Sequence, residues 1–222
     1  MSTKLQLINV ALLKAGVSQT VVQLTEDTRE AFQAGLLFDP TVRETLRAYP
    51  WGFATKYADS AVAATHGDAM KLFDGSPTAP VNGDWIYTYR YPSDCLMARR
   101  LVPPTGRRFS RTPIPFIVGR NAPQVEADPS GDLVLIFTNE PDAVLEYTAA
   151  VDLEIASFTE PLFEDVLTTL LASKLAMSLS REPRLALQLY NIFLAILPTA
   201  KAISGREQQQ EKPGEAEWIE GR

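Results

Sequence analysis

The sequence predicts an α+β protein in which N- and C-terminal helices form one bundle and a small antiparallel β domain is inserted between them. Apolar residues recur at helical spacing near both ends of the chain, whereas aromatic and β-branched residues alternate in the middle. Clusters of Pro, Asn, Asp and Gly separate the alternating segments, which suits a meander or sandwich better than βαβ units. We expect N-terminal helices in residues 1–80, the β domain in 81–152, C-terminal helices in 153–203 and a polar, flexible tail in 204–222.

The first predicted helix covers residues 4–15. Ser2 or Thr3 is available as its N-cap, and Gly16 is suited to the position that follows a helix end. The apolar positions, which follow a 3-4-3 spacing, are Leu5, Ile8, Leu12 and Ala15.

A second helical pattern begins near residue 27 and ends at Pro50. Asp27 followed by Glu30 resembles a capping box. Pro40 leaves two alternatives, either one kinked helix or two helices, the second of which begins at an Asp39 cap. The apolar positions of the pattern are Ala31, Ala34, Phe38, Val42, Leu46 and Tyr49.

Strands are predicted in residues 85–91, 114–119, 132–137 and 143–151, where aromatic and β-branched residues gather between turn residues. Helical spacing returns at Pro161, and its apolar stripe is too wide for one partner helix. After Pro183 the pattern repeats, and Pro198 is expected to kink or end that helix. Its predicted apolar positions are Leu185, Leu189, Ile192 and Ile196, with Phe193 and Leu197 beside them.

Composition bounds the class of protein. A chain of 222 residues with 45% apolar and 22% charged residues is ordinary for a globular protein, which excludes disorder of the whole chain. One cysteine allows no internal disulfide, so we expect synthesis in a reducing cytoplasm. The N-terminal pattern is wrong for a signal peptide, and polar residues interrupt the most apolar run, 185–203, so we expect no membrane partner.

Charge is distributed unevenly. The net charge of −6 argues against general affinity for nucleic acid. Residues 90–120 hold seven arginines and one acid, so this segment carries +6 and the rest of the chain −12. Within it Arg107, Arg108 and Arg111 flank Phe109. They form either a solvated hairpin tip or a surface that contacts phosphates or an acidic protein.

We expect no catalytic, cofactor or metal site. His66 is the single histidine and lies in a predicted loop, so a metal cluster or a catalytic triad would depend on it alone. Cys95 follows Pro92, Ser93 and Asp94 at the entry to a predicted strand, and it is either a buried small hydrophobe or a reactive thiol. Carboxylates at the start of the helix after Glu160 are explained by the helix macrodipole.

The C-terminal tail carries one apolar pair, Trp218 and Ile219, between acidic residues. Such a pair in a polar segment is suited to anchor the tail when it docks on a partner. We therefore predict a partner contact there.

Four segments carry a family resemblance: INVALLKAG at 8–16, LLFDPTVRETLRAYPWGFATKYA at 36–58, YRYPSDCLMARRL at 89–101 and FTEPLFEDVLTTLLASKLAMSL at 158–179. In order and spacing, over most of residues 5–195, they resemble the tail tubular protein A, or head-to-tail adaptor, family of short-tailed phages (podoviruses). The resemblance implies a non-enzymatic structural subunit of the virion neck. Such subunits form a twelvefold ring that joins the portal to the tail nozzle and extends the DNA channel.

The resemblance also implies the partners. They are further copies of the chain, the portal protein, the nozzle or other tail proteins, and double-stranded DNA that passes through the lumen without sequence-specific binding. It implies no catalytic residue and no cofactor. We expect the arginine segment to face a partner protein or a neighbouring copy more than the bore.

The aromatic residues Tyr49, Trp51, Phe53 and Tyr57 gather where the second helix ends. A ring subunit needs two non-identical adhesive surfaces, and these side chains, together with the helices that have wide apolar stripes, could supply them. The alternative is that Trp51 and Phe53 close the bundle within one chain. We expect Trp51 in the core, with Tyr49 or Tyr57 nearer the edge.

Two other functions stay open at this point. One is a tail-associated enzyme that degrades the cell wall. The other is a monomeric nucleic-acid-binding module that uses Arg107, Arg108 and Arg111.

Overall fold

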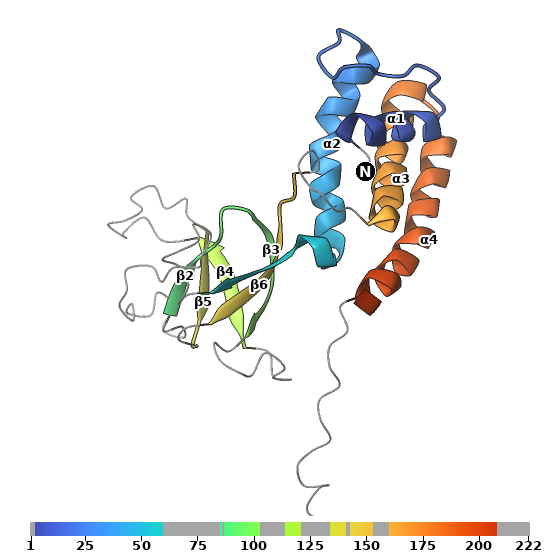
Figure 1. Ribbon diagram of the computed structural model, residues 1–222. Helices are drawn as coiled ribbons and strands as arrows, with labels where there is room; N and C mark the ends of the chain where they lie inside the picture. Colours follow the sequence, from blue (N-terminus) through green and yellow to red (C-terminus); the bar gives the residue numbers. More distant parts are fainter. Residues whose placement is uncertain are drawn as a thin grey trace, which may run out of the picture. The chain divides into compact units, whose positions relative to one another are not determined.

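The computed structural model is a mixed α+β protein and describes residues 3–59, 85, 87–102, 114–120, 134–140, 143–152 and 160–207. These residues form four α-helices and two three-stranded antiparallel sheets (Figure 1). The chain divides into two compact units. Unit 1 comprises Met1–Ala54 and Ala150–Gln209 and holds the helices, and unit 2 holds the sheets within Thr55–Ala149. The predicted α+β class is confirmed.

Helix α1 (Lys4–Lys14) begins where its sequence predicts and ends one residue earlier than predicted. Thr3, rather than Ser2, is the N-cap, and both halves of a capping box form with Gln6. Ala15 caps the C-terminus, and Gly16 follows with φ +76°, a left-handed conformation that glycine adopts without a Cβ penalty.

Helix α2 (Arg29–Ala48) begins one residue later than predicted. Thr28 is its N-cap, because the Thr28 side chain accepts a hydrogen bond from the amide of Ala31 at 3.2 Å, so the predicted role of Asp27 is wrong. The helix continues through Pro40 as one element. Proline removes the helical donor of the Leu36 carbonyl, and because both residues lie on the exposed side of α2, solvent can supply a donor there.

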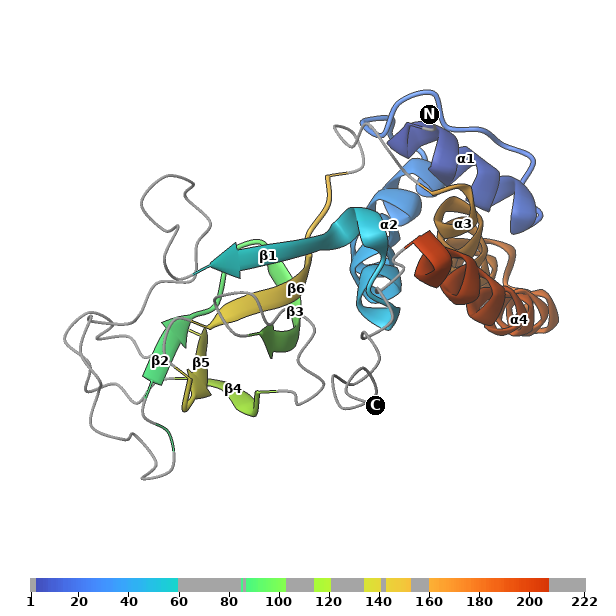
Figure 2. The same cartoon turned by 60° about the horizontal axis from the view of Figure 1, so that its bottom comes forward.

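Helix α3 (Pro161–Leu175) has its proline in the first turn, as predicted. It contacts α1, α2 and the last helix, α4, and lies between α2 and α4 (Figures 1 and 2). Its buried residues are Phe163, Val166, Leu167, Thr168, Thr169, Leu170, Leu171, Ala172, Ser173 and Leu175. The wide apolar surface of this helix is therefore covered inside a single chain.

Two lysines fasten α3 to the N-terminal helices. The Lys14 ammonium donates to Asp165 Oδ1 at 2.6 Å and to the hydroxyls of Thr168 and Thr169 at 2.9 Å each. From the other side, Lys174 forms an ion pair with Glu44 on α2. Each cation has fixed acceptors, which sets the register of α3 against α1 and α2.

A π-helical turn, η2 (Ala176–Ser180), ends α3, and Arg181 then adopts a left-handed conformation with φ +53°. Helix α4 (Pro183–Glu207) follows and continues through Pro198. Pro198 therefore does not end the helix, and residues 204–207, which we expected in the tail, are helical. Pro198 is exposed, as is Leu194, whose carbonyl loses its helical donor to the proline.

Unit 2 contains six strands in two sheets, in the orders β1-β6-β3 and β2-β5-β4. The strands are β1 (Thr55–Asp59), β2 (Tyr87–Arg90), β3 (Cys95–Val102), β4 (Phe116–Arg120), β5 (Val134–Thr138) and β6 (Val144–Ala149). The four predicted strand segments correspond to β2, β4, β5 and β6. The sequence pattern missed β1, which we expected to belong with the N-terminal helices, and it marked only the entry to β3.

The two sheets share one core. Alternate residues of β6, including Leu145 and Tyr147, point into it together with Tyr89 of β2 and Ile136 of β5. On the other face of β6, Glu146 forms an ion pair with Arg100. The fold of unit 2 is thus a small sandwich with a period-2 pattern on its central strand.

Candidate protein interface

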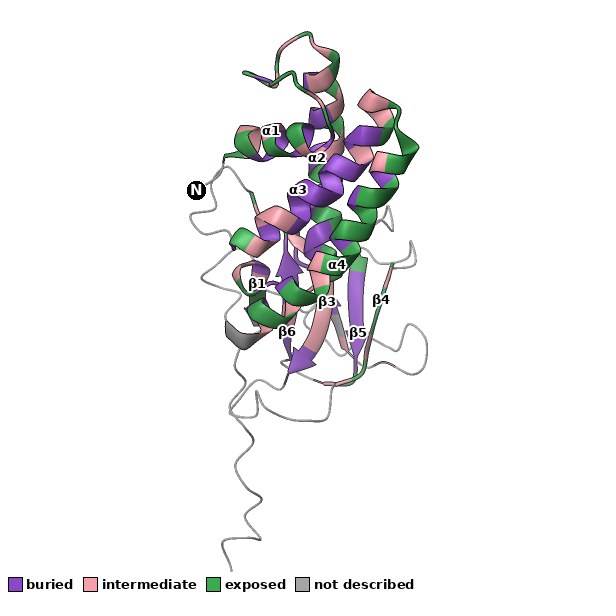
Figure 3. Cartoon of the chain, turned by 90° about the vertical axis from the view of Figure 1, so that its right-hand side faces the viewer, coloured by how far each residue is buried: buried purple, intermediate pink, exposed green. Residues whose placement is uncertain are grey.

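Helix α4 exposes much of its apolar surface. Its buried stripe consists of Ala186, Leu189, Phe193, Ala200 and Ser204. Ile192, which we predicted on the buried stripe, is instead 47% exposed. In Figure 3, much of the α4 surface that faces the viewer is exposed. Only 22% of the most apolar stretch of this helix is buried, so most of the stretch has no cover within the chain.

Three exposed apolar residues of α4, Leu187, Tyr190 and Leu194, lie on one flank at the spacing i, i+3, i+7. Their exposed fractions are 61%, 43% and 48%. We call them the α4 patch. The Tyr190 ring is fixed against the buried ring of Phe193 at a centroid distance of 5.8 Å. Residues 185–200 contain no charged side chain, which is unusual for a surface helix of a monomer.

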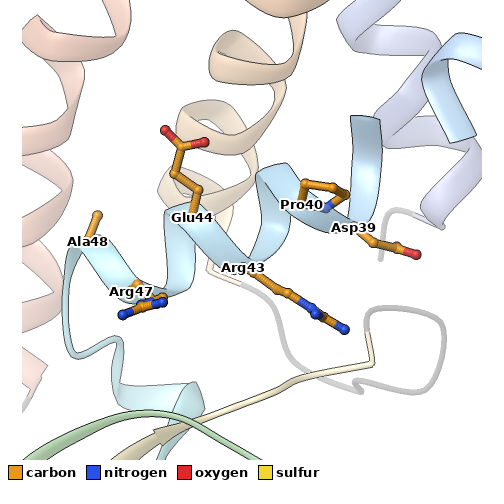
Figure 4. A pocket seen from close by; sticks show the side chains of 6 residues that line it. All are labelled: Asp39, Pro40, Arg43, Glu44, Arg47 and Ala48. Carbon is orange, nitrogen blue, oxygen red and sulfur yellow. The ribbon is translucent and has the colours of Figure 1, made fainter. Parts of the chain in front are cut away.

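The outward face of α2 forms a second exposed apolar patch. Phe32 is 70% exposed and Leu36 64%, and they lie one turn apart, away from α3. We call them the α2 patch. The polar half of the same face follows, where a pocket is lined by Asp39, Pro40, Arg43, Glu44, Arg47 and Ala48 (Figure 4). Arg43 and Arg47 extend from one side of the helix, and Glu44 points away from them toward its partner Lys174 (Figure 4).

The aromatic residues at the end of α2 do not form an exposed patch. Trp51 is fully buried, and its ring packs edge-on against the ring of Phe163 in α3 at a centroid distance of 5.2 Å. The ring of Phe53 also packs against that of Phe163, at 4.9 Å. Tyr49 is half-buried and stacks edge-on against Trp51 at 5.4 Å. Trp51 is therefore part of the core of unit 1, as expected.

Tyr57 belongs to the other unit. It lies on β1 with 57% of its surface exposed, and so it is nearer an edge than Trp51, as expected. Of the four aromatic residues, Tyr49, Trp51 and Phe53 are brought together in unit 1.

The arginine and tryptophan residues that we predicted to contact partners are not part of either patch. Arg107, Arg108, Arg111, Trp218 and Ile219 lie outside the described residues, as does His66. Their predicted roles stay predictions.

Cys95 begins β3 and is half-buried. Burial raises the pKa of the Cys95 thiol from 9.0 to about 11, a shift to which the nearby Asp94 carboxylate contributes. A thiol with so high a pKa is almost wholly protonated at neutral pH, which favours the reading of Cys95 as a small hydrophobe over a reactive nucleophile.

Among the residues that the structure describes, no group of three or more His, Cys, Asp or Glu side chains is placed to hold a metal ion. Within the same residues one helix, Pro183–Gly205, is long and apolar enough to cross a membrane by length and composition alone.

No protein-family model and no curated protein matches the sequence. The α2 patch and the α4 patch are therefore identified from the structure of the chain alone. Sequence reasoning missed their residues because it searched for core stripes. The available signals were the uncharged run 185–200 and the pair Phe32 and Leu36, which fall off the buried stripe of α2.

Proposed function

We propose that the chain is a non-enzymatic structural subunit of the neck of a short-tailed phage. In this proposal identical copies form a ring, twelve in number, that docks on the portal and continues its channel toward the tail nozzle. The finer architecture would be a helical bundle of α1 to α4, with the β domain inserted in the chain between α2 and α3. The chain would be made in the host cytoplasm and would function in the virion.

One observation supports self-association most directly. Unit 1 exposes two different apolar patches, on α2 and on α4, and α3 lies between these helices. A subunit in a ring contacts its two neighbours through two different surfaces, whereas a two-fold dimer needs only one. Two unlike patches on helices separated by a third suit the ring.

The same observation corrects the expected source of adhesion. We expected the aromatic residues near Trp51 and the wide apolar stripes of the C-terminal helices, α3 and α4, to supply it. The aromatic cluster and the stripe of α3 are satisfied inside one chain, because Trp51 is fully buried and α3 has three partner helices. Of the expected surfaces α4 stays exposed, and in the proposal the outward face of α2 is the second adhesive surface.

Partners beyond the ring follow from the sequence. The tail with Trp218 and Ile219 would dock on the portal, and the arginines at 107, 108 and 111 would face a partner protein or neighbouring copy. DNA that moves through the bore should meet few cations, because each neutralised phosphate adds affinity. A predominantly acidic chain is compatible with such a lumen.

The test combines the purified full chain with the portal protein of the same phage. Negative-stain imaging and native mass spectrometry should show a ring of the chain seated on the portal ring. A chain cut after Glu207, which keeps α4 whole, and the variant Trp218→Ala should both bind the portal more weakly. A chain that stays monomeric with the portal present, and binds no portal, would remove the proposal.

Unchanged portal binding by both tail variants would remove only the role of the tail. A peptidoglycan-cleavage assay on the same preparations is a further check, because reproducible cleavage lost on a single carboxylate substitution would contradict a non-enzymatic role.

A further inference from the structure

We infer that the ring junction is made by the α4 patch of one copy packed against the α2 patch of the next. The inference rests on the proposed function, since it takes the partner to be a second copy of this chain. It assigns the two adhesive surfaces to Leu187, Tyr190 and Leu194 on one side and to Phe32 and Leu36 on the other.

The two patches share an unusual backbone feature. In α2 the carbonyl of Leu36 has lost its helical donor to Pro40, and in α4 the carbonyl of Leu194 has lost its donor to Pro198. Each patch therefore contains a strong acceptor that needs a donor from outside the helix. Proline also distinguishes this flank of α4 from the opposite flank, which carries Ile192 and Ile203.

Each patch also carries donors that suit the other. Arg43 lies on the same outward face of α2 as Leu36, and the exposed Tyr190 of the α4 patch carries a hydroxyl that can donate. Because residues 185–200 carry no charge, the arginines of α2 meet no like charge from the α4 patch. Docking of one patch on the other can thus bury both carbonyls with partners.

The same feature argues for a protein partner over a lipid bilayer. An acceptor without a donor is costly in hydrocarbon, and the side chains of Gln188 and Asn191 add further polar groups to the same helix. Water or a neighbouring protein can satisfy these groups, whereas lipid chains cannot.

The exposed areas of the two patches suit a weak junction that is stabilised when the ring closes. With side chains of roughly 200 Å² each, the two residues of the α2 patch expose about 250 Å² and the three of the α4 patch about 300 Å². At an apolar share of roughly 60%, these patches imply a contact of about 900 Å², slightly below the roughly 1,000 Å² that a specific interface usually exceeds. A closed ring, in which every copy has two junctions, stabilises such contacts through multivalency.

The test uses two charge-insertion variants at the most exposed positions, Leu187→Glu on α4 and Phe32→Glu on α2. Each alone should raise the dissociation constant for self-association at least about thirtyfold, the effect of losing one hot spot. Val22→Glu is the matched control, because Val22 is an equally exposed apolar residue outside both patches. Sedimentation velocity measures assembly, and circular dichroism at 222 nm verifies that each variant keeps its helices.

Mixing the two variants decides the pairing. A Leu187→Glu copy keeps its α2 patch and a Phe32→Glu copy keeps its α4 patch, so a mixture should form one intact junction, giving one-to-one dimers but no rings. The inference is wrong if Phe32→Glu assembles like the wild type, or if the mixture stays monomeric. In both cases a wild-type ring would leave the proposed function in place.

A wild-type chain that forms no ring, alone or on the portal, would remove both conclusions together. Binding to phosphatidylcholine vesicles that Leu187→Glu abolishes and Phe32→Glu preserves would instead show that α4 meets lipid, and would also overturn the inference.

Discussion

Truncation of Trp51 tests whether this aromatic cluster belongs to the core of a single chain. The indole is fully buried, and its Nε1 donates to the Thr45 carbonyl at 2.9 Å. Thr45 lies in the last turn of α2, where helix carbonyls lack helical donors, so the indole also caps the helix. Its other neighbours are the rings of Phe163 and Tyr49.

The magnitude follows from these contacts. Trp51→Ala should lower the free energy of unfolding of unit 1 by about 3–5 kcal/mol, the usual cost of deleting a large core aromatic. Trp51→Phe keeps a ring but loses roughly 40 Å² of apolar burial, worth about 1 kcal/mol, and leaves the Thr45 carbonyl without its donor, worth about 1–2 kcal/mol. We therefore expect about 2–3 kcal/mol for Trp51→Phe.

Urea denaturation followed by circular dichroism at 222 nm is the appropriate assay. All described helices belong to unit 1, and this signal does not depend on tryptophan fluorescence. Protein concentration must be the same for all variants, because self-association would add to stability. Val22→Ala, at a 70% exposed position, should change the free energy by less than about 0.5 kcal/mol. If Trp51→Ala were as mild as this control, Trp51 would not be a core residue of the isolated chain.

The remaining predictions concern Lys14, Pro198 and Cys95. Lys14→Met should lower the free energy of unfolding by about 1–2 kcal/mol in the same urea assay, because Asp165 and two buried threonine hydroxyls lose a common donor. The effect of this substitution should be smaller in an Asp165→Asn background. Pro198→Ala should restore a donor to the Leu194 carbonyl, which should increase the circular dichroism signal of helix and raise the free energy of unfolding by about 1–3 kcal/mol. If the free energy of unfolding did not rise, the proline would cause no strain in α4. Cys95 should react with iodoacetamide at pH 8 about 100-fold more slowly in the folded chain than in urea, because burial raises the pKa of its thiol to about 11. Between its ordinary pKa and that raised value the unfolded chain binds fewer protons, so this thiol should also make stability fall as pH rises from about 9 to 11.

The sequence alone determined the elements whose signals are local. A capping residue at one end, a glycine near the other and a regular apolar spacing define α1 to within one residue, since each signal acts within a turn of the helix. The β-branched and aromatic residues of β5 and β6 likewise mark strands that contribute to a shared core. The sequence pattern did not predict β1, because its five residues, TKYAD, include few strand formers. Pairing with β6 makes this segment a strand.

Only the tertiary structure decided which apolar surfaces are covered. α3 and α4 both show wide apolar stripes in sequence, yet three partner helices cover α3, whereas much of the apolar surface of α4 stays exposed. The prolines of α2 and α4 are tolerated for the same kind of reason, since the carbonyls that lose their donors lie on exposed faces. Periodicity shows that a helix has an apolar side, but the number of neighbours that cover this side depends on contacts between residues far apart in the chain.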